Sequence, residues 1–176
     1  MEEFLKSVEK KAFRIIQIAL GGNDDALDIL QDSMMAFVRY YSEKNRSEWK
    51  PLFYRVVQNK IRDWFRKEKL KRIFFIRSSG APQDESENHS DPIESVRDHK
   101  NMDALTTIKT SQAMKRLNDV LRRLPQRQQQ VFLLRAWEGL STHETAMAMN
   151  CTEGTVKTHY FRALRKLKHE LEGTWP

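Results

Sequence analysis

The sequence predicts an all-α fold in which two small helical domains are joined by a flexible acidic linker. Apolar residues recur at steps of three and four along most of the chain, which is the period of an amphipathic helix. Between residues 78 and 101 this period is lost and the composition changes to Ser, Gly, Pro, Asn, Asp and Glu, which is typical of a flexible linker. We therefore expect one domain at residues 1–76, a linker at 77–101 and a second domain at 102–176.

Composition narrows the class of protein. The 176 residues are 39% apolar and 31% charged, which allows compact helical cores but not the core of a large enzyme. A net charge of +7 points to an anionic partner, and nucleic acid fits best because no apolar run approaches the twenty or so residues that span a membrane. The acidic start after Met1 has no signal-peptide pattern, so we expect a cytoplasmic protein. A single cysteine, Cys151, excludes an internal disulfide.

The N-terminal domain begins with two predicted helices. The first covers Phe4 to Leu20 and ends at two glycines, which favour the left-handed end of a helix. The second begins with Asn23 as its cap. The positions predicted to face inward on the second helix are Ala26, Ile29, Leu30, Phe37, Val38 and Tyr41. Its outer face is acidic or polar, which simple solvation would also explain; the positions are Asp24, Asp28, Gln31, Asp32 and Met35.

After a polar loop at 42–50, a long helix is predicted from Pro51, which suits the first turn, to about Phe75. Its predicted buried edge is Phe53, Val57, Ile61 and Trp64. A second edge is largely cationic and comprises Arg55, Asn59, Arg62, Arg66 and Lys69. Cations interleaved with Tyr54, Trp64 and Phe65 suit single-stranded DNA, because phosphates need cations and unstacked bases need flat partners. Packing in the domain core is the alternative role for the aromatic residues.

The C-terminal domain is predicted to end in a helix-turn-helix. A helix from Met102 to Leu124 comes first, and Pro125 opens another that ends at Glu138-Gly139. Ser141 and Glu144 then stand at capping-box spacing, the next helix breaks at Asn150-Cys151, and Thr152 caps the last helix. One face of that helix forms an apolar stripe: Val156, Tyr160, Ala163, Leu164, Leu167 and Leu171. Its other faces are basic or polar: Lys157, Thr158, His159, Arg162, Arg165, Lys166 and Lys168. Such a helix fits a DNA major groove, although a merely solvated face would look similar.

No catalytic pattern in the sequence is complete. His143-Glu144 begins like the zinc motif H-E-x-x-H, but Met147 stands where the second ligand must be. The chain has no phosphate-binding glycine loop, C-x-x-C or G-x-S-x-G. We therefore expect no catalytic residue, no metal, no cofactor and no small-molecule substrate, and a protein that is not an enzyme.

Two separate stretches resemble one family. The C-terminal series Leu124-Pro125-Gln126-Arg127, Glu138-Gly139-Leu140-Ser141, Gly154-Thr155-Val156-Lys157 and Phe161-Arg162-Ala163 resembles the C-terminal domain of sigma-70 family initiation factors, in their extracytoplasmic-function (ECF) group. Residues 155–159 also resemble the recognition helix of LuxR-type regulators, which bind duplex DNA without being polymerase subunits.

The N-terminal half favours the sigma factors, because residues 25–32 resemble the D-A-E-D-[IL]-[VL]-Q-[ED] signature of sigma region 2, which LuxR-type proteins lack. Tyr54 to Asn59, with Asp63 and Arg66, resembles a second stretch of that region. Leu27 replaces a glutamate and Leu52 a tryptophan of the family pattern, and Trp49 stands three residues before Leu52. Whether Trp49 packs in the core or faces DNA is left open.

The resemblance implies a sigma factor that binds core RNA polymerase and directs it to promoters. It implies that the helix-turn-helix domain docks on the flap of the second-largest subunit and reads the minus-35 element, using Thr155, Lys157, Thr158, His159, Phe161, Arg162, Arg165 and Lys166. It implies minus-10 recognition of melted DNA by the N-terminal domain, using Trp49, Tyr54, Arg55, Asn59, Arg62, Arg66 and Lys67. It implies contact with the clamp of the largest subunit through Asp28, Gln31, Asp32 and Met35. Group membership also suggests an anti-sigma factor as a further partner.

Overall fold

The computed structural model describes residues 1–79 and 104–172, and every regular element in these ranges is a helix. In chain order they are α1 (Glu2–Leu20), α2 (Asp24–Tyr41), α3 (Arg46–Ser79), α4 (Ala104–Arg122), α5 (Gln126–Phe132), the π-helical segment η1 (Leu133–Trp137), α6 (Thr142–Met149) and α7 (Glu153–Leu171). The all-α prediction is confirmed. Among the described helices none is long and apolar enough to cross a membrane. Most of the predicted linker lies outside the described ranges, but α3 continues to Ser79 and so enters it.

The junction of α1 and α2 largely follows the sequence signals. Gly21 ends α1 in the left-handed conformation, with φ 85°, as the glycine pair predicted. Asn23 precedes α2, but its side chain caps nothing, and that part of the prediction is wrong. The Asn23 carboxamide oxygen instead accepts a hydrogen bond from the side chain of Gln17. Since Gln17 is buried, its amide needs a partner more than the exposed end of α2 does.

The start of α3 corrects a second prediction. The helix begins at Arg46 and not at Pro51, so the expected loop at 42–50 shrinks to residues 42–45 and Pro51 lies inside the helix. A proline within a helix removes one backbone hydrogen bond, and tertiary packing has to offset that loss. Trp49, in the added turn, supplies such packing: its ring lies 5.5 Å from that of Phe4 and 6.4 Å from that of Phe37.

The N-terminal core is built around aromatic rings. Phe37 and Phe53 are fully buried with their ring centroids 5.6 Å apart, as their predicted inward positions require.

Two other predicted core residues, Val38 of α2 and Leu164 of α7, are about two-fifths exposed, and their assignment is wrong. Both lie at the edge of the apolar face of their helix, where side chains are only partly covered by the neighbouring helices.

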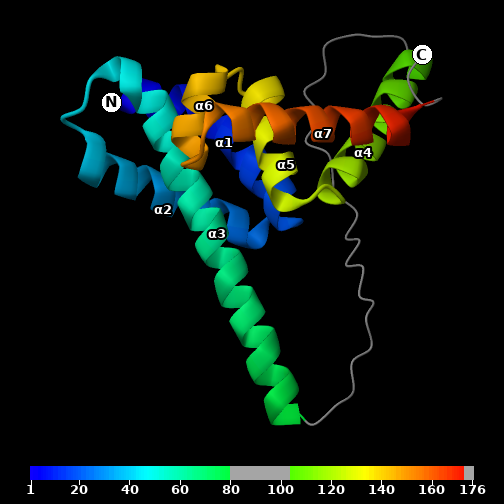
Figure 1. Cartoon of the computed structure of the whole chain (residues 1–176), viewed down its shortest axis with the longest axis horizontal. Coiled ribbons are helices and arrows are strands. Elements are labelled where there is room, and N and C mark those ends of the chain that lie inside the picture. The colour runs from blue at the N-terminus through cyan, green and yellow to red at the C-terminus, as the bar shows by residue number, and fades with distance from the viewer. Residues whose placement is uncertain (80–103, 173–176) are drawn as a thin grey trace.

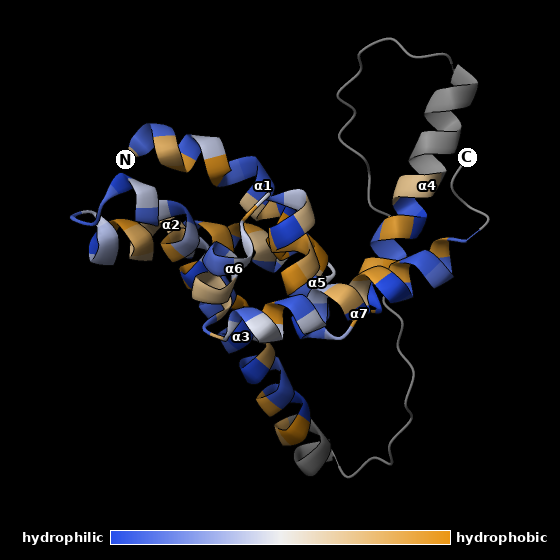
Figure 2. Cartoon of the chain, turned by 45° about the horizontal axis from the view of Figure 1, so that its top comes forward, coloured by the Kyte–Doolittle hydropathy of each residue, from blue (hydrophilic) through white to orange (hydrophobic). Residues whose placement is uncertain are grey.

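The N-terminal and C-terminal halves pack against each other. Helix α6 lies along the first part of α3, and α4 and α5 contact α1 (Figure 1). Buried residues of both halves form one contiguous apolar cluster. The second part of α3 leaves this body and projects away, carrying a mixture of hydrophilic and hydrophobic residues (Figure 2). The division into two domains remains a prediction, and in this arrangement the predicted domains touch.

Candidate nucleic-acid interface

The helix-turn-helix is built by the caps that the sequence predicted. The Ser141 hydroxyl accepts from the amide of Glu144 at 3.1 Å, and the Glu144 carboxylate accepts from the amide of Ser141 at 2.7 Å. These bonds hold the pKa of Glu144 below its usual value. Asn150 ends α6 in the left-handed conformation, with φ 51°. Thr152 then caps α7 by accepting from the amide of Thr155 at 3.2 Å, so the turn between the two helices is fixed at both ends.

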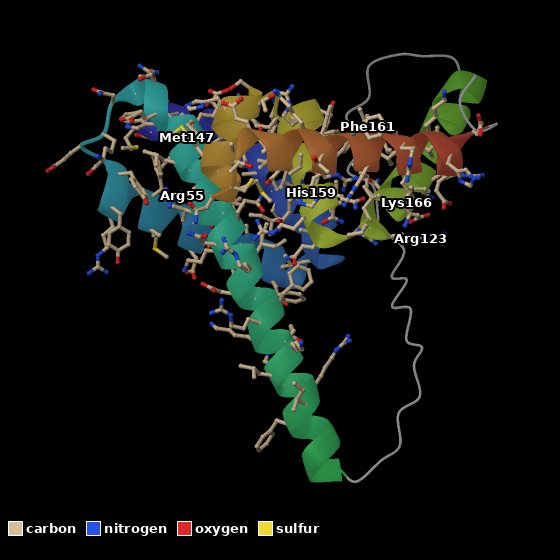
Figure 3. The ribbon with its side chains drawn as sticks, in the orientation of Figure 1. Arg55, Arg123, Met147, His159, Phe161 and Lys166 are labelled. Atoms are coloured by element: carbon tan, nitrogen blue, oxygen red, sulfur yellow. The ribbon has the colours of Figure 1, made fainter. Side chains whose placement is uncertain are left out.

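Helix α7 presents most of its predicted DNA-binding residues to solvent. Its apolar stripe seats the helix through Val156, Ala163 and Leu167, which are buried. The predicted residues that are exposed are Lys157, Thr158, Phe161, Arg162, Arg165 and Lys166. Phe161 is 65% exposed, which is unusual for a ring of that size unless a partner covers it. Phe161 and His159 lie on opposite sides of the helix (Figure 3).

Two predicted contact residues of α7 are only partly accessible. Thr155 is half-buried beside the Thr152 cap, and the two hydroxyls lie 2.9 Å apart. His159 is also half-buried, and burial lowers the pKa of its imidazole, with the charges of Arg162 and Arg127 acting in the same direction. The imidazole is therefore neutral near pH 7, and its hydrogen-bonding capacity matters more than its charge.

A concave surface lies between α7 and the start of α5. The cavity has a volume of about 490 Å³ and is lined by Pro125, Gln128, Arg162, Arg165, Lys166 and His169. Three cations around one hollow create a positive potential that suits a phosphate group. Lys166 also donates to the backbone oxygen of Arg123 at 3.4 Å, at the end of α4 (Figure 3).

The predicted minus-10 residues divide into a covered group and an accessible group along α3. Tyr54 is fully buried, and Arg55 donates to the side-chain oxygen of Asn150 at 3.4 Å, in the turn before α7 (Figure 3). Trp49 packs on the aromatic core, and its indole N–H donates to the Lys44 carbonyl at 2.8 Å. The structure thus brings Tyr54 and Arg55 against the C-terminal half, whereas Trp49 packs within the N-terminal half.

Further along α3 the predicted residues are more open. Arg62 donates to the side-chain oxygen of Asn59 at 2.7 Å, and Arg66 lies 3.8 Å from the Asp63 carboxylate. Asn59, Arg66 and Lys67 are exposed and Arg62 is half-buried. Asn59, Arg66 and Lys67 are therefore open to solvent, whereas Arg62 lines a small hollow with Gln126, Arg127 and Met149 of the C-terminal half.

The predicted polymerase-binding strip is a continuous exposed face of α2. Asp28, Gln31 and Asp32 are exposed, and Met35 is 64% exposed. One of the carboxylates is engaged within the chain, because Lys60 of α3 donates to Asp32 at 2.9 Å. Both partners of this ion pair are solvent-accessible, so the pair contributes about 0–1 kcal/mol and can be exchanged for an external partner.

The structure also contains a polar site that sequence reasoning missed. The Glu138 carboxylate is only 3% exposed and lies 2.9 Å from the amino group of Lys50 and 3.8 Å from that of Lys11. Burial, followed by the charge of Glu138, raises the pKa of Tyr54 above the ordinary value for a tyrosine. One signal was present in the sequence: an acidic residue at the C-terminal end of a helix opposes the helix dipole and calls for a cationic partner.

The residues of the incomplete zinc motif have other roles. Glu144 belongs to the capping box, and His143 lies 3.2 Å from the carboxylate of Glu153. Within residues 1–79 and 104–172 no group of His, Cys, Asp and Glu side chains is arranged to hold a metal ion.

The body of the protein is all helical, α7 presents an exposed basic face, and α3 carries a second cationic surface. Together these features define a helix-turn-helix DNA-binding protein. Comparison with known proteins identifies its family. Residues 114–167 match the family model "Sigma-70, region 4". The chain is 31% identical to the RNA polymerase sigma-E factor of Streptomyces coelicolor over 175 residues, covering 97% of this chain and 85% of that protein. The sigma-E factor of Streptomyces avermitilis is equally similar, with 97% and 84% covered.

A shorter match and a more distant solved structure are also sigma factors. The ECF RNA polymerase sigma factor SigD of Mycobacterium tuberculosis is 43% identical over 56 residues, 32% of this chain and 26% of that protein. The fold is similar to that of the sigma factor RpoE of Bartonella quintana, solved in complex with the anti-sigma factor NepR, with a TM-score of 0.62, 20% identity and 98% and 99% of the two chains covered. The chain belongs to the ECF group of the sigma-70 family of RNA polymerase sigma factors. The LuxR-type alternative is not favoured, because these matches extend over both halves.

Proposed function

We propose that this sigma factor holds core RNA polymerase and promoter DNA through three separate surfaces. The exposed face of α7 reads the minus-35 element, the cationic side of α3 binds the melted minus-10 element, and the acidic strip of α2 docks on the polymerase clamp. The single observation that carries the proposal is the division of exposed charge. Cations cover α7 and α3, whereas Asp28 and Asp32 form an acidic strip on α2.

Within α7 the roles follow position along the helix. Side chains in the first half of a recognition helix reach base edges, and cations further along grip the backbone. Lys157, Thr158, Phe161 and Arg162 are therefore assigned to base contacts or to the groove wall. Arg165, Lys166 and Lys168 are assigned to phosphate. The hollow beside α5 places Arg162 and Arg165 together, so Arg162 stands at the boundary of the two groups.

The factor supplies specificity, and the polymerase performs the chemistry. In this proposal the chain is not itself an enzyme and works in the cytoplasm, where it meets polymerase and chromosomal DNA. An anti-sigma factor is a further proposed partner. The solved complex of the Bartonella quintana factor with NepR supports this proposal by similarity of fold.

The direct test is reconstitution. Sigma-free core polymerase is mixed with the full chain and with genomic fragments, and transcript starts are mapped. The proposal predicts that the protein co-elutes with core polymerase and that starts gather at a small set of sites sharing two spaced elements. A chain that binds duplex DNA but neither joins polymerase nor changes its start sites would contradict the proposal and favour a free DNA-binding regulator.

A further inference from the structure

The projecting end of α3 carries three large apolar side chains that face solvent. Leu70, Ile73 and Phe74 are 61%, 44% and 76% exposed. They lie beyond the point where α3 leaves the packed body (Figure 1 and Figure 2), and the sequence continues with Phe75 and Ile76. Single exposed apolar residues are common on soluble proteins, but neighbouring ones on a projecting element indicate a surface that another molecule covers. We call Leu70, Ile73 and Phe74 the apolar tip.

Helix geometry gathers the apolar tip on one face of α3 and places cations at its borders. Residues at positions i, i+3 and i+4 share a face of a helix, and Leu70, Ile73 and Phe74 have this spacing. With 3.6 residues per turn, Lys67 and Lys69 lie at the two edges of that face. Both lysines are exposed. The end of α3 is therefore an amphipathic helix whose apolar face lies between two positive charges.

The chemistry of the apolar tip disfavours DNA and a second copy of the chain as its occupant. Melted DNA is bound by cations on its phosphates and by flat rings on its bases, and Leu70 and Ile73 supply neither. In a pair of identical chains, contact between the two tips would bring Lys67 and Lys69 of both chains together. Juxtaposed like charges cost binding energy, so the occupant has to be anionic around an apolar centre.

The length of the apolar tip favours a lipid surface over a partner helix. From Leu70 to Phe74 the helix rises only ~6 Å, and one turn nearer the body the same face carries the exposed Arg66. A seam between two helices needs apolar residues that repeat over several turns. A bilayer needs no repeat, because acyl chains adapt to any inserted side chain while lysine and arginine reach the phosphates of the headgroups.

We propose that the apolar tip inserts into the headgroup region of an anionic phospholipid bilayer, with Lys67 and Lys69 on the lipid phosphates. The charge around the tip supports this occupant. Residues 66–72 include five Lys or Arg and one acid, Glu68, which lies 2.7 Å from Lys71. Each cation near an anionic membrane surface adds to the attraction. Lys67 also belongs to the proposed minus-10 surface, so lipid and promoter DNA use this residue in turn.

Co-sedimentation of the full-length chain with vesicles tests the surface. We expect binding to vesicles of phosphatidylglycerol and phosphatidylcholine in equal amounts, and none to vesicles of phosphatidylcholine alone. Leu70→Ser with Phe74→Ser should weaken binding about tenfold, because the buried apolar area is lost. Val38→Ser with Tyr40→Ser removes one aliphatic and one aromatic side chain at exposed positions of α2 and should bind like the parent. Circular dichroism verifies that both variants keep their helices.

Insertion is measured separately, because charge alone also draws a basic chain to anionic vesicles. In a Cys151→Ser background, an environment-sensitive dye is attached at Ile73→Cys, within the apolar tip, or at Lys71→Cys, on the far side of the same turn. The dye at position 73 should shift to shorter emission wavelengths on the phosphatidylglycerol vesicles, because it leaves water. The dye at position 71 should keep its emission in buffer. Single-stranded DNA of random sequence replaces the vesicles in a parallel titration.

Each alternative occupant gives its own result. Equal vesicle binding by the Leu70/Phe74 variant and the α2 control, or an unshifted dye at position 73, would overturn the proposal. A larger shift with single-stranded DNA than with vesicles would assign the tip to nucleic acid, and a shift that grows with protein concentration without lipid would assign it to a second copy. Failure to direct initiation by core polymerase would contradict only the proposed function, because the vesicle measurements contain no polymerase.

Discussion

Individual side chains of α7 are expected to differ in what they contribute to DNA binding. Arg162 is exposed and borders the hollow beside α5, whereas Lys168 is exposed further along the helix. A guanidinium group can pair with a base through two hydrogen bonds, and a lysine ammonium contacts phosphate as a point charge. The two residues therefore allow base reading and backbone binding to be tested separately.

Arg162→Ala is predicted to cost roughly 1–3 kcal/mol of binding to the correct upstream element and much less on scrambled DNA. Lys168→Ala is the matched control and should weaken binding about equally on both. Fluorescence anisotropy of the holoenzyme on the two duplexes provides the measurement. Equal losses on both DNAs for Arg162→Ala would refute base reading by that residue.

His159 gives a prediction about pH. Burial and two neighbouring arginines lower its pKa below the ordinary 6.5, so the folded chain disfavours the charged imidazole. A lowered pKa contributes stability above the unfolded value of about 6.5, and that contribution is lost as pH falls through the folded value. NMR titration should show His159 half-protonated below pH 6.5. A midpoint at or above 6.5 would show that burial and the two arginines do not lower the pKa of the ring as the structure indicates.

Among the elements, the helix-turn-helix shows how local signals set a fold. Ser141, Asn150 and Thr152 were assigned from residue type and spacing alone, and each has its predicted cap or turn role. Capping could be predicted because it involves groups only a few residues apart. The prediction that α3 begins at Pro51 was wrong for the opposite reason. The helical turn before Pro51 depends on Trp49 packing against Phe4 and Phe37, which are distant in the sequence.

The capping box predicts the effect of one hydroxyl. Ser141→Ala removes the acceptor for the Glu144 amide and should lower the free energy of unfolding by about 1 kcal/mol. Chemical denaturation monitored by circular dichroism measures the change. Ser7→Ala on α1, where the hydroxyl only contacts the backbone oxygen of Phe4, serves as control and should change stability by less than half as much. Equal losses would mean that the cap does not start α6.

The acidic strip on α2 predicts a binding defect. Asp28→Arg with Asp32→Arg should weaken the association with core polymerase about tenfold or more, because coupling of close charge pairs at interfaces is worth at least ~1.5 kcal/mol. Glu9→Arg with Glu43→Arg makes the same change in net charge at exposed positions off the strip and should bind normally. Native gel titration distinguishes the variants. Normal binding by the first variant would contradict the placement of the polymerase interface.

At the scale of the whole molecule, the packing of the two halves was beyond sequence reasoning. Glu138 appeared in the sequence only as the end of a helix, and nothing local pairs it with Lys50, 88 residues earlier, or with Lys11. The same contact explains why Tyr54, assigned to DNA from a family pattern, is buried here. Local patterns predicted the helices and the exposed faces, whereas contacts between distant segments decide which faces are available at a given moment.

In the proposed function, two surfaces of one chain direct polymerase to two spaced DNA elements. Hydroxyl-radical footprinting of the holoenzyme on a promoter found by start-site mapping tests it most directly. We expect two protected patches upstream of the start, with the distal patch lost and the proximal patch retained in Arg162→Ala. A single continuous patch, or loss of both patches together in that variant, would contradict it.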